Sequence, residues 1–170
     1  MRVAIPALLL LTVSTSCGRG PDLVVHQTAV VLDTTAPFAH HPDFARRLES
    51  TMSAALEYWG GDWKVLAHRT VTFQDEQFVA CGGMGTALGC FDGDIRLTTR
   101  DPSIGTFRCV EATVLVHEIG HAVIGDRDHR DPRWMDFERV AQELAGRIGY
   151  PDGSAPCELY PSVWRHVPGS

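Results

Sequence analysis

Residues 113–121 read Thr-Val-Leu-Val-His-Glu-Ile-Gly-His, with two histidines four positions apart in an apolar stretch. Positions i and i+4 of an α-helix lie on one face about one turn apart, so His117 and His121 are predicted to point the same way. Two such imidazoles can bind one zinc ion. Glu118 projects at a different angle, from which its carboxylate can act as a base toward a zinc-bound water. The stretch therefore predicts a zinc-binding helix with a catalytic carboxylate.

A chance match on a surface helix would also produce this pattern. The strongly apolar residues 113–116, however, predict that the helix is buried. Burial of one unpaired carboxylate and two imidazoles costs free energy, and a bound metal ion removes that cost. We therefore favour zinc binding.

Residues 114–121 resemble the active-site helix of the metzincin zinc peptidases, in particular the matrixins. The family pattern, HExxHxxGxxH, continues to a third histidine and then to a methionine-containing turn, the Met-turn. In this chain the glycine, Gly125, stands one residue late, and Arg127 holds the position of the third histidine. Arginine cannot ligate zinc, so the third ligand must lie elsewhere.

Two neighbouring residues are candidates for the third ligand. Asp128 lies three residues after Gly125, as the family spacing measured from glycine requires, and some related families use Asp there. His129 gives a site of three histidines and is slightly favoured, in which case Asp128 acts as a hydrogen-bond partner of a ligand. A gluzincin-like hydrolase, with Glu138 or Glu143 as the third ligand, is an alternative.

The resemblance extends to further segments. Met135 lies six residues after His129 and resembles the Met-turn methionine, which lies beneath the metal in the family. Residues 94–99 stand where these peptidases have the edge strand that pairs with an extended substrate. Residues 42–59 match the first long helix of the family, and residues 136–149 its C-terminal helix.

Hydrophobic periodicity predicts an α+β fold independently of this resemblance. Strands are predicted at residues 23–32, 63–73 and 94–99, a loop at 78–90, and helices at 42–59, 109–124 and 137–148. Within the helix at 42–59, offsets of three and four place Phe44, Leu48, Met52, Ala55, Leu56 and Trp59 on one face. Together with the resemblance, this predicts a small mixed twisted sheet with a long N-terminal helix, an active-site helix and a C-terminal helix.

Residues 1–16 predict a secretory signal peptide. Arg2 precedes an apolar stretch that is too short for an ordinary transmembrane helix, and small residues follow it. Cys17 comes next and resembles the lipobox cysteine of bacterial lipoproteins, although Ser14 stands where leucine is usual. The resemblance implies a lipid on Cys17 that anchors an exported protein to the membrane of the bacterial cell envelope, with plain secretion as the alternative.

Five cysteines are an odd number for an exported chain. Setting Cys17 aside as the lipid site leaves four, for which three disulfide connectivities exist. We favour Cys81–Cys90, which closes a glycine-rich loop, and Cys109–Cys157, which ties the segment before the motif helix to the C-terminal tail. The chain has no CxxC pair, so a metal site of four thiolates is disfavoured.

The chain has 170 residues, of which 44% are hydrophobic and 21% charged, and this composition fits a single globular domain at residues 23–170 after a tether at 17–22. Its net charge is −6 without a long basic run, so we expect no nucleic-acid partner. We expect a monomer that acts on a peptide or protein substrate. A zinc-binding lipoprotein without catalytic activity is the alternative, because the altered ligand loop could leave a poor site.

Overall fold

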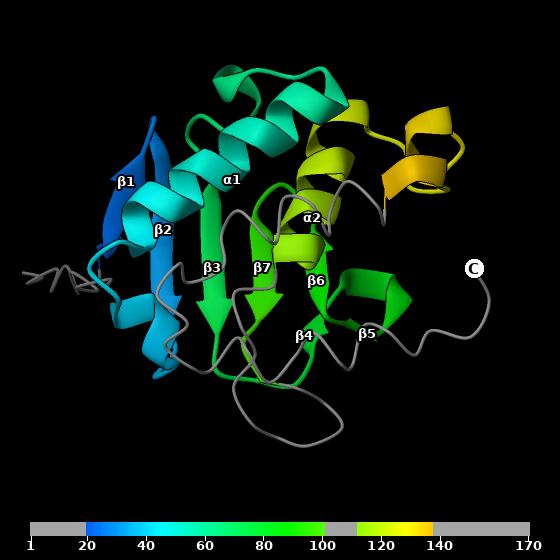
Figure 1. Cartoon of the computed structure of the whole chain (residues 1–170). Coiled ribbons are helices and arrows are strands. Elements are labelled where there is room, and N and C mark those ends of the chain that lie inside the picture. The colour runs from blue at the N-terminus through cyan, green and yellow to red at the C-terminus, as the bar shows by residue number, and fades with distance from the viewer. Residues whose placement is uncertain (1–19, 101–111, 138–170) are drawn as a thin grey trace, which may run out of the picture.

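The computed structural model describes residues 20–100 and 112–137 (Figure 1). In chain order its elements are β1 (Leu23–Val25), β2 (Thr28–Asp33), the 3-10 helix η1 (Pro37–His40), α1 (Phe44–Trp59), η2 (Trp63–Val65), β3 (Thr70–Gln74), β4 (Val79–Ala80), η3 (Gly82–Met84), β5 (Thr86–Ala87), β6 (Gly89–Phe91), β7 (Ile95–Thr98), α2 (Ala112–Ile124) and η4 (Pro132–Asp136). The following predictions lie outside the described residues: the signal peptide, the lipid site at Cys17, the Cys109–Cys157 disulfide, the residues Glu138 and Glu143, and the helix predicted after Phe137.

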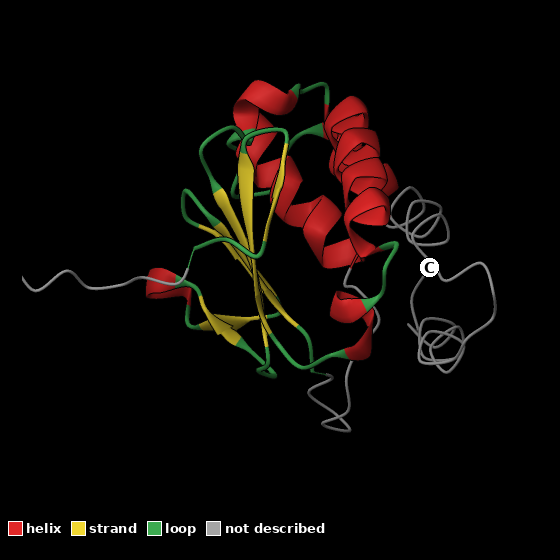
Figure 2. Ribbon diagram, turned by 90° about the vertical axis from the view of Figure 1, so that its left-hand side faces the viewer, coloured by secondary structure: helices red, strands yellow, loops and turns green. Residues whose placement is uncertain are grey.

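Five strands form one mixed, twisted sheet in the order β1-β2-β3-β7-β6. The three inner strands run parallel to one another, whereas β1 and β6 run antiparallel to their neighbours at the two edges. Helices α1 and α2 pack against each other on one face of this sheet (Figure 2). The prediction of an α+β fold with a small mixed sheet is confirmed.

The spacing of apolar residues explains how both helices bury one face. Helix α1 lies within the range predicted for it, and all six residues of its predicted apolar face are buried. Gly60 ends α1 in a left-handed conformation, with φ of 77°, and its N–H donates to the last turn of the helix. Helix α2 buries Leu115, Val116 and Ile119. In the described part of the chain, we find no helix with the length and apolarity needed to span a membrane.

Two of the predicted strands differ from the structure. Residues 23–32 form the hairpin β1–β2 rather than one strand, because His26 and Gln27 adopt positive φ angles of 45° and 67° and reverse the chain. In the strand predicted at 63–73, only the last part is extended. Asp62 accepts a hydrogen bond from the N–H of Lys64 at 2.8 Å and starts the 3-10 helix η2, so β3 begins at Thr70.

The segment that leads to the site was predicted as a loop but contains three short strands, β4, β5 and β6. The predicted Cys81–Cys90 disulfide is present within it, with the two Cα atoms 5.4 Å apart. The strand predicted at residues 94–99 is β7, but it does not lie at the edge of the sheet. It pairs with β3 on one side and β6 on the other, so β6 forms the edge.

Candidate metal centre

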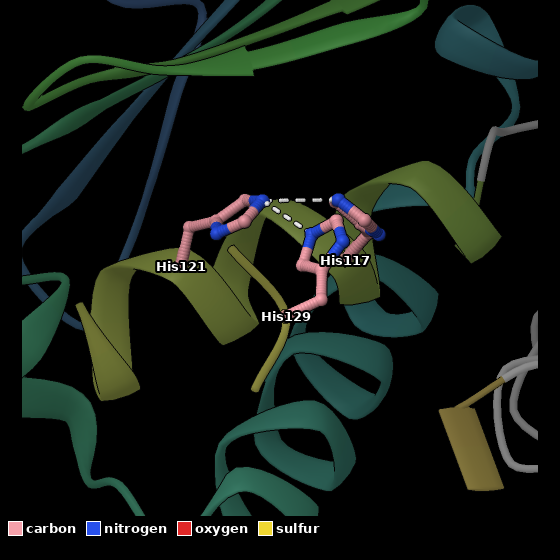
Figure 3. Close-up of side chains that lie close together, drawn as sticks. All are labelled: His117, His121 and His129. Carbon is pink, nitrogen blue, oxygen red and sulfur yellow. Dashed lines mark hydrogen bonds between the residues drawn. The ribbon is translucent and has the colours of Figure 1, made fainter. Parts of the chain in front are cut away.

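Three imidazole Nε2 atoms converge beside α2 (Figure 3). His117 and His121 lie one turn apart on α2, and His129 comes from the loop that follows. The Nε2 atom of His121 is 3.0 Å from that of His117 and 3.2 Å from that of His129. The three ligand atoms all lie within 4.8 Å of one another. Two nitrogens at zinc-bonding distance in a tetrahedral site would be roughly 3.3–3.4 Å apart, which is close to the two distances from His121. Among the described residues, this is the group of His, Cys, Asp and Glu side chains that could hold a metal ion.

The carboxylate of Asp126 determines the shape of the loop that carries His129. Its Oδ1 accepts the N–H of Asp128 at 2.9 Å, and its Oδ2 accepts those of Arg130 at 2.5 Å and Asp131 at 2.8 Å. These three bonds lower the pKa of Asp126, with that from Asp131 contributing most. They enclose His129, which has a positive φ of 55° that L-residues rarely adopt. The loop is thereby folded back so that this imidazole reaches α2.

Asp128, the other candidate for the third ligand, lies away from the imidazoles. Its carboxylate is exposed and pairs with Arg130 at 2.8 Å, and it does not belong to the converging group. Gly125 occupies the first position after α2 with φ of 70°, and its N–H donates to the carbonyl of His121 at 3.0 Å. The displaced glycine is thus a helix cap, after which the chain needs four residues to bring an imidazole back.

The histidines of α2 are held in the form that a metal requires. The Nδ1 atom of His121 lies 2.8 Å from the carbonyl oxygen of Asp126. A carbonyl can only accept, so Nδ1 carries the proton and Nε2 presents its lone pair toward the other imidazoles. Burial, assisted by the neighbouring imidazoles, lowers the pKa of His117 to about 4, and burial also lowers the pKa of His121. Both rings are therefore neutral at neutral pH, as metal ligands must be.

Glu118 lies on the face of α2 that meets the sheet edge. Its side chain is only 5% exposed, and burial raises its pKa to about 7, although a hydrogen bond from the backbone N–H of Phe91 acts in the opposite direction. Gly89 makes this approach possible. A Cβ at Gly89 would lie 2.3 Å from Cγ1 of Val114 and 2.7 Å from Oε1 of Glu118. Only glycine lets β6 and α2 come this close.

Strand β6 is an edge strand, and its outer backbone groups lie beside Glu118 without a further strand to pair with. The N–H of Thr98 donates to the carbonyl of Leu88, and that of Asp92 donates to the carbonyl of Asp94. In an antiparallel pair such bonds recur at every second residue, so the backbone N–H and C=O groups of Leu88, Cys90 and Asp92 point toward β7. The N–H and C=O groups of Gly89 and Phe91 consequently point away from the sheet, toward α2 and the pocket.

The prediction that Met135 lies beneath the metal-binding histidines is wrong. Its side chain is 90% exposed in the 3-10 helix η4 instead of lying beneath the histidines. The residue that lies there is Trp134, whose ring centroid is 4.9 Å from that of His117, 5.1 Å from that of His121 and 4.3 Å from that of His129. In a tight turn with three residues per turn, adjacent side chains point in different directions, so only one of the pair can face inward.

Helix α1 fixes the position of Trp134. The ring of Trp59 packs against that of Trp134 with centroids 4.3 Å apart. The hydroxyl of Tyr58 donates to the carbonyl of Arg133 at 2.5 Å, and the Arg133 guanidinium donates to the carbonyl of Trp59. Gly120 lets both indoles approach α2, because a Cβ there would be 2.7 Å from Trp59 and 2.8 Å from Trp134.

A pocket of about 580 Å³ opens beside the histidines. Its walls come from β6 and the segment before it, from one face of α2, from the loop at 125–129 and from Phe137, and most of its lining is apolar. Of the described residues that line it, Glu118 has the one carboxyl group and Arg127 the one guanidinium.

The structure thus places His117, Glu118, His121 and His129 in the wall of one pocket, and it leaves Asp128 and Met135 outside that wall. Four further residues shape the site without having been predicted from the sequence: Gly89, Phe91, Asp126 and Trp134. Of these, only Asp126 carries a local sequence signal, in the loop-forming pattern Asp126–Asp128. We compared the chain with models of known protein families, with curated proteins and with solved structures, and none matches it.

Proposed function

We propose that this protein is a zinc-dependent peptidase. The observation that carries the proposal is the convergence of three imidazole Nε2 atoms beside a buried carboxylate in one pocket. Zinc favours nitrogen donors of this kind, and His129 as the third ligand gives the three-histidine set common in catalytic sites. A dication also offsets the cost of burying the charged form of Glu118. When bound, zinc supplies a Lewis acid that polarises a carbonyl and lowers the pKa of water.

Glu118 is the proton carrier in this proposal. Its carboxylate accepts a proton from the attacking water and delivers it to the leaving amine. Burial keeps this carboxylate a stronger base than an exposed glutamate. The hydrogen bond from the N–H of Phe91 orients it.

We further propose that an extended peptide binds along the outer edge of β6. The outward carbonyls of Gly89 and Phe91 and the N–H of Gly89 are available for main-chain hydrogen bonds. This assigns to β6 the role expected for residues 94–99, which form an inner strand. The edge of β6 adjoins Glu118, so a bound peptide would pass beside the histidines.

Cleavage and metal content should be measured on the same purified full-length chain. We expect one zinc ion per chain, cleavage of a broad peptide library by the wild type, and no cleavage by Glu118→Gln with zinc still bound. A wild type that binds zinc but cleaves no peptide would refute the peptidase proposal and favour a non-catalytic zinc-binding protein.

The ligand set needs its own comparison, in which the chain supplies a matched pair. We expect His129→Ala to lower zinc affinity sharply and the adjacent Asp128→Ala to leave zinc bound. The gluzincin-like alternative predicts instead that Glu138→Ala or Glu143→Ala loses zinc and His129→Ala keeps it.

We also propose that the protein is exported and anchored through a lipid on Cys17. The Cys81–Cys90 disulfide supports export, because disulfides persist in oxidising compartments. Mass spectrometry of the envelope-purified protein should detect an acylated N-terminal Cys17, and an unmodified, freely secreted chain would contradict the anchor.

A further inference from the structure

We propose that Arg127 gives the pocket a preference for substrates with a carboxylate near the bond that is cleaved. This inference rests on the proposed peptidase function and adds a substrate class to it. It starts from the loop between α2 and η4, which is densely charged.

The other charged side chains of this loop have partners in the loop itself or in η4. Asp128 pairs with Arg130 at 2.8 Å, and Asp131 pairs with Arg133 at 2.7 Å. The carboxylate of Asp126 accepts three backbone N–H groups. Within the described residues, the Arg127 side chain has neither a hydrogen-bond partner nor an ion-pair partner.

Arg127 also lies in the wall of the pocket. Arg127 is exposed and lines the pocket, together with His121, His129 and Glu118. The surrounding lining is largely apolar, so a charge bound there meets fewer competing water molecules than on an open surface. Arginine presents a planar fork of donors that fits a carboxylate with two parallel hydrogen bonds.

A carboxylate could come from two parts of a substrate. An acidic side chain close to the cleaved bond would make the protein selective for acidic sequences. A free C-terminus would make it selective for short peptides that end near the site. Both present the same chemical group to Arg127, so the experiment must separate them.

Peptide affinity should be measured on the zinc-loaded full-length chain carrying Glu118→Gln, so that binding occurs without cleavage. One peptide is made in four versions, with Glu or Gln beside the central bond and with a free or an amidated C-terminus. We expect one carboxylate version to bind about fivefold more tightly than its neutral counterpart, the upper range for an exposed ion pair. Arg127→Ala should abolish this preference, and Arg127→Lys should retain part of it. Arg130→Ala is the matched control and should retain all of it.

Each outcome has a separate meaning. A preference for the free C-terminus alone supports recognition of chain ends, and a preference for internal Glu alone supports recognition of an acidic side chain. Equal binding of all four peptides, or a preference that survives Arg127→Ala, overturns the role of Arg127 and leaves the peptidase proposal standing. Failure of every peptide to bind a zinc-loaded chain overturns the peptidase proposal, and the role of Arg127 with it.

Discussion

Replacing Trp134 by alanine would remove the ring against which all three histidines lie. The indole contacts His117, His121 and His129 on one side and Trp59 on the other. Without it, the imidazoles lose the surface that limits their rotation. We therefore expect zinc affinity to fall about 10- to 100-fold, the range for residues that orient metal ligands without touching the metal.

The same change also lowers the free energy of unfolding of the metal-free protein. An aromatic side chain buries 150–250 Å² when fully enclosed, and Trp134 is partly exposed, so we take roughly 120 Å². At about 25 cal/mol per Å² this gives about 3 kcal/mol. A loss of this size permits folding only if the protein has stability to spare, so Trp134→Phe, which keeps a ring, is needed as a milder variant.

Competition between the protein and a chromophoric chelator measures zinc affinity, and urea unfolding in excess chelator measures the stability of the metal-free chain. Tryptophan fluorescence adds a direct readout, because cobalt bound at the histidines should quench the adjacent indole. We expect Trp134→Phe to bind metal nearly as the wild type does but to lose much of this quenching. Met135→Ala, one residue away with an exposed side chain, should change neither property.

Two results would refute this reasoning. In the first, Trp134→Ala folds and retains zinc affinity within about twofold, against the expected 10- to 100-fold loss. In the second, Met135→Ala lowers zinc affinity as much as Trp134→Ala does, which would return Met135 to the position expected from the family resemblance.

Three further substitutions test the surroundings of the histidines. Burial raises the pKa of Glu118 from 4.5 to about 7, so the metal-free wild type loses stability as pH rises between these two values. At pH 8, the free energy of unfolding of Glu118→Gln should therefore exceed that of the wild type by about 3 kcal/mol. At pH 4.5 this difference should be absent. Gly89→Ala should cost about 1–3 kcal/mol in urea unfolding and reduce peptide cleavage, because its Cβ would push α2 from β6. Asp126→Ala should lower zinc affinity about tenfold in chelator competition by releasing the loop that carries His129.

Each of these substitutions has a control or a contrary result. A stability difference between Glu118→Gln and the wild type that does not vary with pH would contradict the raised pKa. Gly83→Ala, where a Cβ meets nothing within 4 Å, controls for the loss of glycine, and it should be nearly neutral. If Asp128→Ala lowers zinc affinity more than Asp126→Ala does, Asp128 has a larger role than its contact with Arg130 indicates.

Local spacing was sufficient to predict the half of the site that lies on α2. His117 and His121 share a face because the helix repeats every 3.6 residues, and no contact with distant residues is needed for that. The apolar face of α1 was predicted for the same reason. The Cys81–Cys90 disulfide joins residues close in sequence, so few alternatives competed with it.

The remaining features depend on contacts between distant segments. The reversal at His26 and Gln27 lacks the glycine or asparagine typical of such turns, so the first hairpin was read as one strand. The order β3-β7-β6 depends on how the strands pair, and alternation along residues 94–99 does not reveal whether that strand is inner or outer. Met135 matched the family by its distance from His129, but distance along a chain does not determine which side of a turn faces inward.

The last turn of α1 holds α2, which carries two of the histidines, and η4, which carries Trp134, in fixed positions relative to each other. Trp59 donates from its indole Nε1 to the carbonyl of Val116 at 2.8 Å, which fixes α2 relative to α1. Tyr58 and the backbone of Trp59 hold Arg133, which fixes η4 and therefore Trp134. The loop between α2 and η4 is thus anchored at both ends, and Asp126 needs to determine only its internal shape.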